Sequence, residues 1–156
     1  MIAEHFMVTE IVTAQDSELT SHVLDKMHQH NLRMLPVVDK NNHVLGIISS
    51  FNIMQCIVPD YLVSGDLNQI SYAPDLGILR KKYKEIINCP IQEMMDTSPL
   101  FVNKGDSLLS IAAAISAHGK HEYALVLAED STLIGVVSAG DILDRLKLKT
   151  SEINDA

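Results

Sequence analysis

The sequence predicts an α/β (α+β) fold made of two βαββα repeats that pack together with pseudo-two-fold symmetry. The stretch VVDKNNHVLGIISSFNIM, from Val37, aligns without gaps with VLAEDSTLIGVVSAGDIL, from Val126, at an offset of 89 residues. Strand-like and helix-like stretches precede both copies in the same order. Neither copy can cover its own apolar surface within a chain of 156 residues, so we expect the two copies to pack against each other.

The first repeat is expected to open with a short strand over residues 11–14, followed by a helix over residues 17–30. Asp16 or Ser17 is placed to cap this helix, because both side chains accept hydrogen bonds from unpaired backbone N–H groups. Apolar residues recur at helical spacing on one face. They are Leu19, Val23 and Met27.

The second repeat is expected to open in the same way, with a strand over residues 100–102 and a helix over residues 107–118. That helix should begin near Asp106 or Ser107 and stop at Gly119, since glycine commonly ends helices. Its apolar positions are Leu109, Ala112, Ala113 and Ile115.

A hairpin and a closing helix complete each repeat. The expected strands are residues 34–38 and 44–48 in the first repeat, and residues 124–127 and 133–137 in the second. Polar turns at residues 40–42 and 129–131 join them. We expect the closing helices to begin after Ser49 and Ser138.

The alignment changes register once. Residues 7–14 resemble residues 95–102 at an offset of 88, not 89, so one residue is gained between Asn103 and Glu122. The pairing of positions in that interval stays open at this point.

The repeats define the expected organisation of the chain. The first occupies residues 5–57 and the second residues 90–147, with a polar tail at 148–156. Residues 58–89 form a connection that contains a helix at about 75–87. Its basic residues are either a solvated face or a contact for an acidic partner or a second subunit. They are Arg80, Lys81, Lys82 and Lys84.

Composition argues against several classes of function. A formal net charge of −8 disfavours non-specific binding to nucleic acid or to an anionic membrane. The first residues do not resemble a secretory signal, and no apolar run approaches the ~18 residues of a membrane span. We therefore expect a cytoplasmic protein without membrane insertion and without a nucleic-acid partner.

Catalytic and metal-binding patterns are also missing from the sequence. No nucleophile stands with a base, no paired carboxylates suggest acid–base chemistry, and no glycine-rich loop suggests phosphate transfer. His118 and His121 lie three residues apart, but no acidic residue completes a metal motif. We expect neither an enzyme nor a metal site.

Three segments carry a resemblance to a known family. They are LPVVD at residues 35–39, LGIISSFNI at 45–53 and IGVVSAGDI at 134–142. A strand, a glycine, apolar residues and then Ser/Thr-x-x-Asp resemble the CBS domain, and two copies in tandem resemble the pair called a Bateman module. SAGD fits this pattern in full, whereas SSFN has Asn52 in place of the aspartate.

The Ser-x-x-Asp pattern has a chemical rationale of its own. A serine at the start of a helix lies beside unpaired N–H groups and the positive end of the helix dipole, which suits a phosphate. Gly140 allows a ligand to approach the backbone, and Asp141 can accept hydrogen bonds from two ribose hydroxyls. Asn52 is a neutral and weaker ribose partner. Alternatively, Ser138 with Asp141, and Ser49 with Asn52, are helix caps only.

The resemblance implies further site residues. Adenine would lie between the first and second strands of a repeat, against Thr13 and Pro36 in the first copy. In the second copy Val102 and Phe101 are rival candidates, because the register is open there. Residues before the second strand would meet phosphates. They are Arg33 in the first repeat, and Lys120 and His121 in the second; a solvated Arg33 and a non-binding His121 remain the alternatives.

The resemblance implies a stand-alone regulatory module that binds an adenine nucleotide or adenosyl ligand in the inter-repeat clefts and signals to a partner protein. No cofactor is required. Few basic residues surround the motifs, which favours AMP or ADP over ATP, with S-adenosylmethionine and NAD as other candidates. A homodimer is expected. The alternative is an assembly adaptor with empty clefts, which the bulky Phe51 in SSFN would permit.

Overall fold

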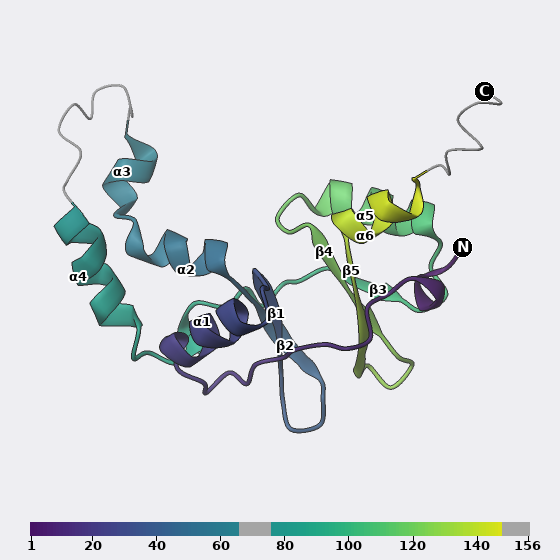
Figure 1. The fold of residues 1–156 in the computed structure, drawn as a ribbon, viewed down its shortest axis with the longest axis horizontal. Helices are drawn as coiled ribbons and strands as arrows, with labels where there is room; N and C mark the ends of the chain where they lie inside the picture. Colours follow the sequence, from purple (N-terminus) through teal and green to yellow (C-terminus); the bar gives the residue numbers. More distant parts are fainter. Residues whose placement is uncertain (66–75, 148–156) are drawn as a thin grey trace. The chain divides into compact units, whose positions relative to one another are not determined.

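The computed structural model, which describes residues 1–65 and 76–147, confirms the α/β fold with two repeats (Figure 1). The chain divides into two compact units. One comprises Val12–Ser98, and the other comprises Met1–Ile11 together with Pro99–Ala156. Each unit has its own sheet and core.

The hairpin of the Val12–Ser98 unit forms as predicted. Strands β1 (Met34–Val38) and β2 (Val44–Ser49) are antiparallel, with Val37 opposite Gly46. The Asp39 carboxylate accepts hydrogen bonds from the backbone N–H groups of His43 and Asn41 in the turn. The first of these bonds is the main reason that the pKa of Asp39 lies below its ordinary value.

The strand expected at residues 11–14 is reduced to a single parallel bridge between Ala14 and Val37. Ala14 donates to the carbonyl of Pro36 at 2.9 Å and accepts from the N–H of Val38 at 2.9 Å. The preceding carbonyl, that of Thr13, accepts a hydrogen bond from a lysine side chain.

Helix α1 (Thr20–Gln29) begins three residues later than predicted, and neither Asp16 nor Ser17 caps it. Its first N–H groups are satisfied by another segment, because Thr20 and Ser21 donate to the carbonyls of Cys89 and Ile87. Leu19, expected on the apolar face, is the N-cap and is 44% exposed. The rest of that face is buried as predicted.

The same unit continues through three helices. They are α2 (Ser50–Ile57), α3 (Asp60–Ser64) and α4 (Leu76–Ile86). Helix α4 agrees with the helix predicted at about 75–87 and contacts α2. Its four basic side chains are exposed. Helix α3 was not anticipated by the sequence.

The second unit contains a three-stranded sheet in the order β3-β4-β5. Strand β3 (Phe101–Asn103) is parallel to β4 (Tyr123–Leu127), and β4 is antiparallel to β5 (Leu133–Ser138). Helices α5 (Leu108–His118) and α6 (Ala139–Arg145) complete the repeat.

The limits of α5 agree with the prediction. Ser107 caps its start by accepting a hydrogen bond from the N–H of Ser110 at 3.1 Å. Gly119 ends it with a φ of +68°, a left-handed conformation that glycine adopts without strain.

In each unit, a segment that follows a 3₁₀ helix pairs with the last strand of the hairpin. Val8, which follows the short 3₁₀ helix η1 (Ala3–His5), exchanges two backbone hydrogen bonds with Val136 on β5. Asp96, which follows η3 (Ile91–Glu93), does the same with Ile47 on β2. One unit therefore combines two separate stretches of the chain, whereas the other is the single stretch Val12–Ser98.

Gly46 and Gly135 occupy equivalent positions on β2 and β5, next to the segments that pair with these strands. A Cβ on Gly46 would lie 2.5 Å from the carbonyl oxygen of Asp96, and a Cβ on Gly135 would overlap the side chain of Met7. Both glycines are buried on the last strand of their repeat, as the alignment predicts.

Candidate functional site

The predicted motif of the second repeat forms a closed hydrogen-bonded unit at the end of β5. Ser138 Oγ accepts from the N–H of Asp141 at 3.1 Å and donates to Asp141 Oδ2 at 2.8 Å. The same Oδ2 accepts from the backbone N–H of Ser138 at 2.8 Å. These contacts orient the carboxylate and leave its Oδ1 with no hydrogen-bond partner among residues 1–65 and 76–147.

The first repeat repeats this arrangement with an amide. Asn52 Oδ1 accepts from the backbone N–H of Ser49 at 3.1 Å and from its Oγ at 2.9 Å, and Ser49 Oγ accepts from the N–H of Asn52 at 3.0 Å. Both motifs are thus capping boxes, as the structural alternative predicts. The caps use only Oδ1 of Asn52 and Oδ2 of Asp141. The second polar atom of each side chain takes no part in the capping box.

The helices and strands determine the register that the sequence leaves open. Helices α1 and α5 begin at Thr20 and Leu108, an offset of 88, whereas β1 and β4 begin at Met34 and Tyr123, an offset of 89. The additional residue therefore lies between the starts of these helices and the strands that follow, and α5 is one residue longer than α1.

This register pairs Thr13 with Phe101 and Ala14 with Val102. Ala14 and Val102 both lie opposite the middle of the next strand and both belong to their core. Val102 is only 6% exposed, whereas Phe101 is 45% exposed. Of the two rivals for an adenine contact, Phe101 is exposed and Val102 is a core residue.

The residue just before the second strand makes the same backbone hydrogen bond in both repeats. The carbonyl of Arg33 accepts from the N–H of Ser50, and the carbonyl of Glu122 accepts from the N–H of Ala139. Arg33 and Glu122 therefore lie beside the two motifs at equivalent places, and both are exposed. The sequence singled out Arg33 but missed Glu122, because the counterpart was sought at Lys120 and His121.

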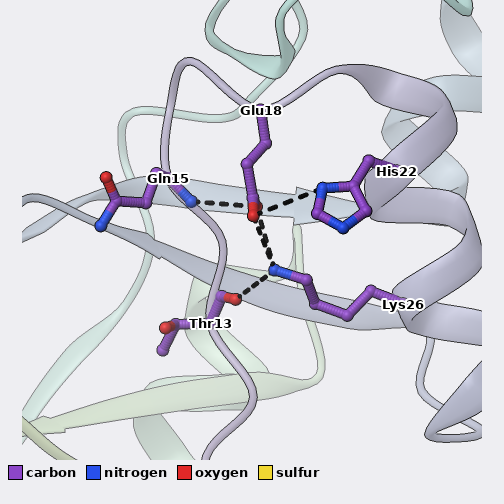
Figure 2. Close-up of polar contacts among 5 residues, drawn as sticks. All are labelled: Thr13, Gln15, Glu18, His22 and Lys26. Carbon is purple, nitrogen blue, oxygen red and sulfur yellow. Dashed lines mark hydrogen bonds and ion pairs between the residues drawn. The ribbon is translucent and has the colours of Figure 1, made fainter.

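Thr13 and Pro36 come together through the Ala14 bridge, since Pro36 accepts from Ala14. A cluster of polar side chains supports this segment (Figure 2). Lys26 Nζ donates to the Thr13 carbonyl at 2.9 Å and to both oxygens of Glu18 at 2.9 and 3.0 Å. Sequence reasoning missed both residues; the signal was a lysine between the buried positions Val23 and Met27 of α1.

Lys120 is exposed, and His121 is half-buried with its ring centroid 6.1 Å from that of His118. Both lie on the loop between α5 and β4, Lys120 two residues and His121 one residue before Glu122. In the described ranges, no group of three or more His, Cys, Asp or Glu side chains is arranged to hold a metal ion.

Gly140 is exposed on the first turn of α6 and has no positive φ. A Cβ there would meet only Ser138 Oγ at 3.6 Å, an ordinary contact. The protein itself therefore has room for a larger residue at this position.

An apolar groove of about 190 Å³ lies between α5 and α6. It is lined by Ala112, Ile115, Ser116, Ala139, Ile142 and Leu143. Of the motif residues only Ala139 lines it, and neither Ser138 nor Asp141 does. Across the part of the chain that the structure describes, no helix is both long and apolar enough to cross a bilayer.

Comparisons with known proteins agree with this architecture. The family model described as the CBS domain matches residues 3–59 and 91–148. Protein MJ1426 of Methanocaldococcus jannaschii is 27% identical over 158 aligned positions, which cover 94% of this chain and 91% of the relative.

Solved structures share the fold at lower identity. Protein MJ1225 of Methanocaldococcus jannaschii has a TM-score of 0.74 at 20% identity, covering 94% of this chain but only 48% of that protein. CBSX2, solved in complex with AMP, has a TM-score of 0.69 at 19% identity, covering 98% of both chains. The CBS domain pair of MJ0100, solved with 5′-methylthioadenosine and S-adenosyl-L-methionine, has a TM-score of 0.67 at 16% identity, covering 93% of this chain and 94% of that one.

Proposed function

This chain belongs to the CBS-domain family, and from that premise we propose that it is a regulatory module that binds an adenine nucleotide or related adenosyl ligand and signals to a partner protein. The role is one of binding rather than catalysis. Two similar folds were solved with AMP or with adenosyl compounds, which supports this class of ligand.

The observation that carries the proposal is the Asp141 carboxylate. Its Oδ2 is held by two hydrogen bonds from Ser138, and its Oδ1 has no partner in the described part of the chain. A fixed carboxylate with a spare oxygen can accept hydrogen bonds from a ribose. We assign Ser138, Gly140 and Asp141 to the ribose side of the second cleft, and Phe101 to the adenine side in place of the buried Val102.

The first cleft is assigned in the same way. Thr13 and Pro36 form the adenine side, Ser49 and Asn52 the ribose side, and Arg33 the phosphate side. Lys120 and His121 supply the basic loop of the second cleft. AMP or ADP suits this module better than ATP, because the exposed cations beside the motifs are few.

Mass spectrometry of small molecules released from natively purified protein tests the proposal. An adenosine-containing compound present at close to one or two molecules per chain would support it. A released ligand without an adenosyl group would contradict it.

Gly140→Ala should raise stability while weakening binding. Alanine has room in the free protein and removes the flexibility of glycine from the unfolded chain, which stabilises by about 0.4–1 kcal/mol. The melting temperature should therefore rise by about 1–4 °C. The added methyl group would meet an adenosyl ligand, so affinity for 5′-methylthioadenosine, measured by calorimetry, should fall at least about tenfold. Gly105→Ala is the control, because nothing lies within 4 Å of its Cβ; equal affinity of both variants would contradict the assignment of Gly140.

We also propose a homodimer through the outer face of α5 and α6. Leu109 is 78% exposed and Leu143 is 65% exposed, and Leu143 lines the apolar groove between these two helices. Light scattering at high micromolar concentration should give the mass of two chains, and Leu143→Asp should give that of one. Val63→Asp, at an exposed valine on α3, should remain dimeric. A monomeric wild type would refute this interface.

A further inference from the structure

The two repeats differ in charge at positions that the structure pairs. In the first repeat, Lys26 and Glu18 form an ion pair beside Thr13, with Nζ to Oε1 at 2.9 Å (Figure 2). The counterpart of Lys26 in the second repeat is Ala114, because both are the seventh residue of their helix. The counterpart of Glu18 is Asp106, which bonds the N–H of Asn103 as Glu18 bonds that of Gln15. The second repeat therefore keeps the acid and lacks the cation.

The remaining two pairs change in the same direction. Arg33, beside the first motif, is replaced by Glu122 beside the second. Asn52, which closes the first capping box, is replaced by Asp141. Over the four paired positions the formal charge is +1 in the first repeat and −3 in the second, and Lys120 changes the second value only to −2. Histidines are left out of this count.

We propose that the two clefts select adenosyl ligands of different charge. The first takes a phosphate-bearing nucleotide such as AMP, which Arg33 attracts. The second takes an adenosyl ligand without phosphate, either neutral like 5′-methylthioadenosine or cationic like S-adenosylmethionine. This inference rests on the proposed function.

Electrostatics explains why the selection would be effective. A phosphate carries about −1.5 to −2 charges at pH 7. Glu122 and Asp141 would repel it, while the same carboxylates favour a sulfonium cation. The side chains of Arg33 and Glu122 are exposed, so the selection should be strongest at low ionic strength and weaken as the Debye length falls to about 8 Å at physiological salt. A module built in this way responds to two ligands at once.

Calorimetric titration of the whole chain tests the proposal at about 20 mM salt, well below physiological ionic strength. AMP should bind at one site per chain, and S-adenosylmethionine should still bind at one site when AMP is saturating. Arg33→Glu should weaken AMP at least about tenfold and leave S-adenosylmethionine unchanged. Glu122→Arg should weaken S-adenosylmethionine and raise the AMP stoichiometry from one to two.

Lys40→Glu is the matched control, since it reverses an exposed charge in the turn at the far end of β1. It should change neither titration by more than about twofold. Competition of both ligands for the same sites, or insensitivity of both to Arg33→Glu and Glu122→Arg, would overturn the charge selection while leaving the proposed function intact. Failure of every adenosyl ligand to bind would instead refute the proposed function.

Discussion

Gly46→Ala is expected to destabilise the protein by about 3 kcal/mol, the upper end of the usual cost of overpacking. The new Cβ would lie 2.5 Å from the carbonyl oxygen of Asp96. That carbonyl accepts the hydrogen bond from Ile47 at 2.8 Å, so relieving the clash breaks the backbone pairing that holds residues 91–98 in the unit. The melting temperature should fall by about 6–12 °C, as differential scanning calorimetry would measure.

Gly135→Ala provides the contrast. Its Cβ would meet the side chain of Met7 rather than a backbone atom, and a methionine side chain can move. Gly135→Ala should therefore cost less stability than Gly46→Ala, and adding Met7→Ala should restore part of the lost stability. If Gly46→Ala melted like the wild type, the exchange of backbone bonds between Ile47 and Asp96 would not contribute to stability as described.

Asp141→Asn is expected to weaken binding of an adenosyl ligand to the second cleft by about ten- to a hundredfold. Hydrogen bonds to a charged group contribute about 1.5–3 kcal/mol, which corresponds to that range of affinity. Asparagine closes the same capping box in the first repeat, so this variant should fold and melt close to the wild type. 5′-Methylthioadenosine is the suitable probe, because it has no phosphate whose repulsion the substitution would also relieve.

Asp141→Ala should lose at least as much affinity. It should also lose stability, since alanine cannot complete the cap, and a lost cap costs about 0.5–2 kcal/mol. Asp144→Ala is the matched control on the same helix, where the carboxylate is exposed and bonded to Lys147 at 2.7 Å. Asn52→Ala should change the affinity of the second cleft for 5′-methylthioadenosine little. Undiminished binding by Asp141→Asn would show that the ribose lies elsewhere.

Local patterns predicted the repeats well. The hairpins, the Ser107 cap and the Gly119 stop follow from side-chain alternation and from helix-end chemistry, which depend on neighbours along the chain. The capping boxes at Ser49 and Ser138 were foreseen as the structural alternative to a binding site. The caps at Ser49, Ser107 and Ser138 each join residues that are three positions apart in the chain.

Long-range contacts explain what was missed. Helix α1 starts at Thr20 because Cys89 and Ile87 satisfy its first N–H groups, and no local pattern shows that partner. The strand expected at residues 11–14 keeps one bridge to β1, through Ala14, and the Thr13 carbonyl is bonded to Lys26, a residue far along the chain. The pairings of Val8 with Val136 and of Ile47 with Asp96 also join residues that are far apart in the chain.

The Ser-x-x-Asp motif could be found from the sequence, but the register of the residues around it could not. Ser-x-x-Asp defined the motif, whereas Phe101 and Glu122 required the helix starts that the structure provides. A one-residue change in helix length between the repeats is invisible to a pattern of apolar positions, because both lengths bury the same face.

The central claim, that this module binds an adenosyl ligand, is tested most directly by thermal melting with AMP, ADP, ATP, S-adenosylmethionine, 5′-methylthioadenosine and NAD. A ligand at about 100 times its dissociation constant stabilises by about 2.7 kcal/mol, which should raise the melting temperature by about 5–10 °C. We expect such a rise with at least one adenosyl compound and a smaller one for Asp141→Asn with 5′-methylthioadenosine. An unchanged melting temperature with all six compounds would contradict the account and favour an assembly adaptor with empty clefts.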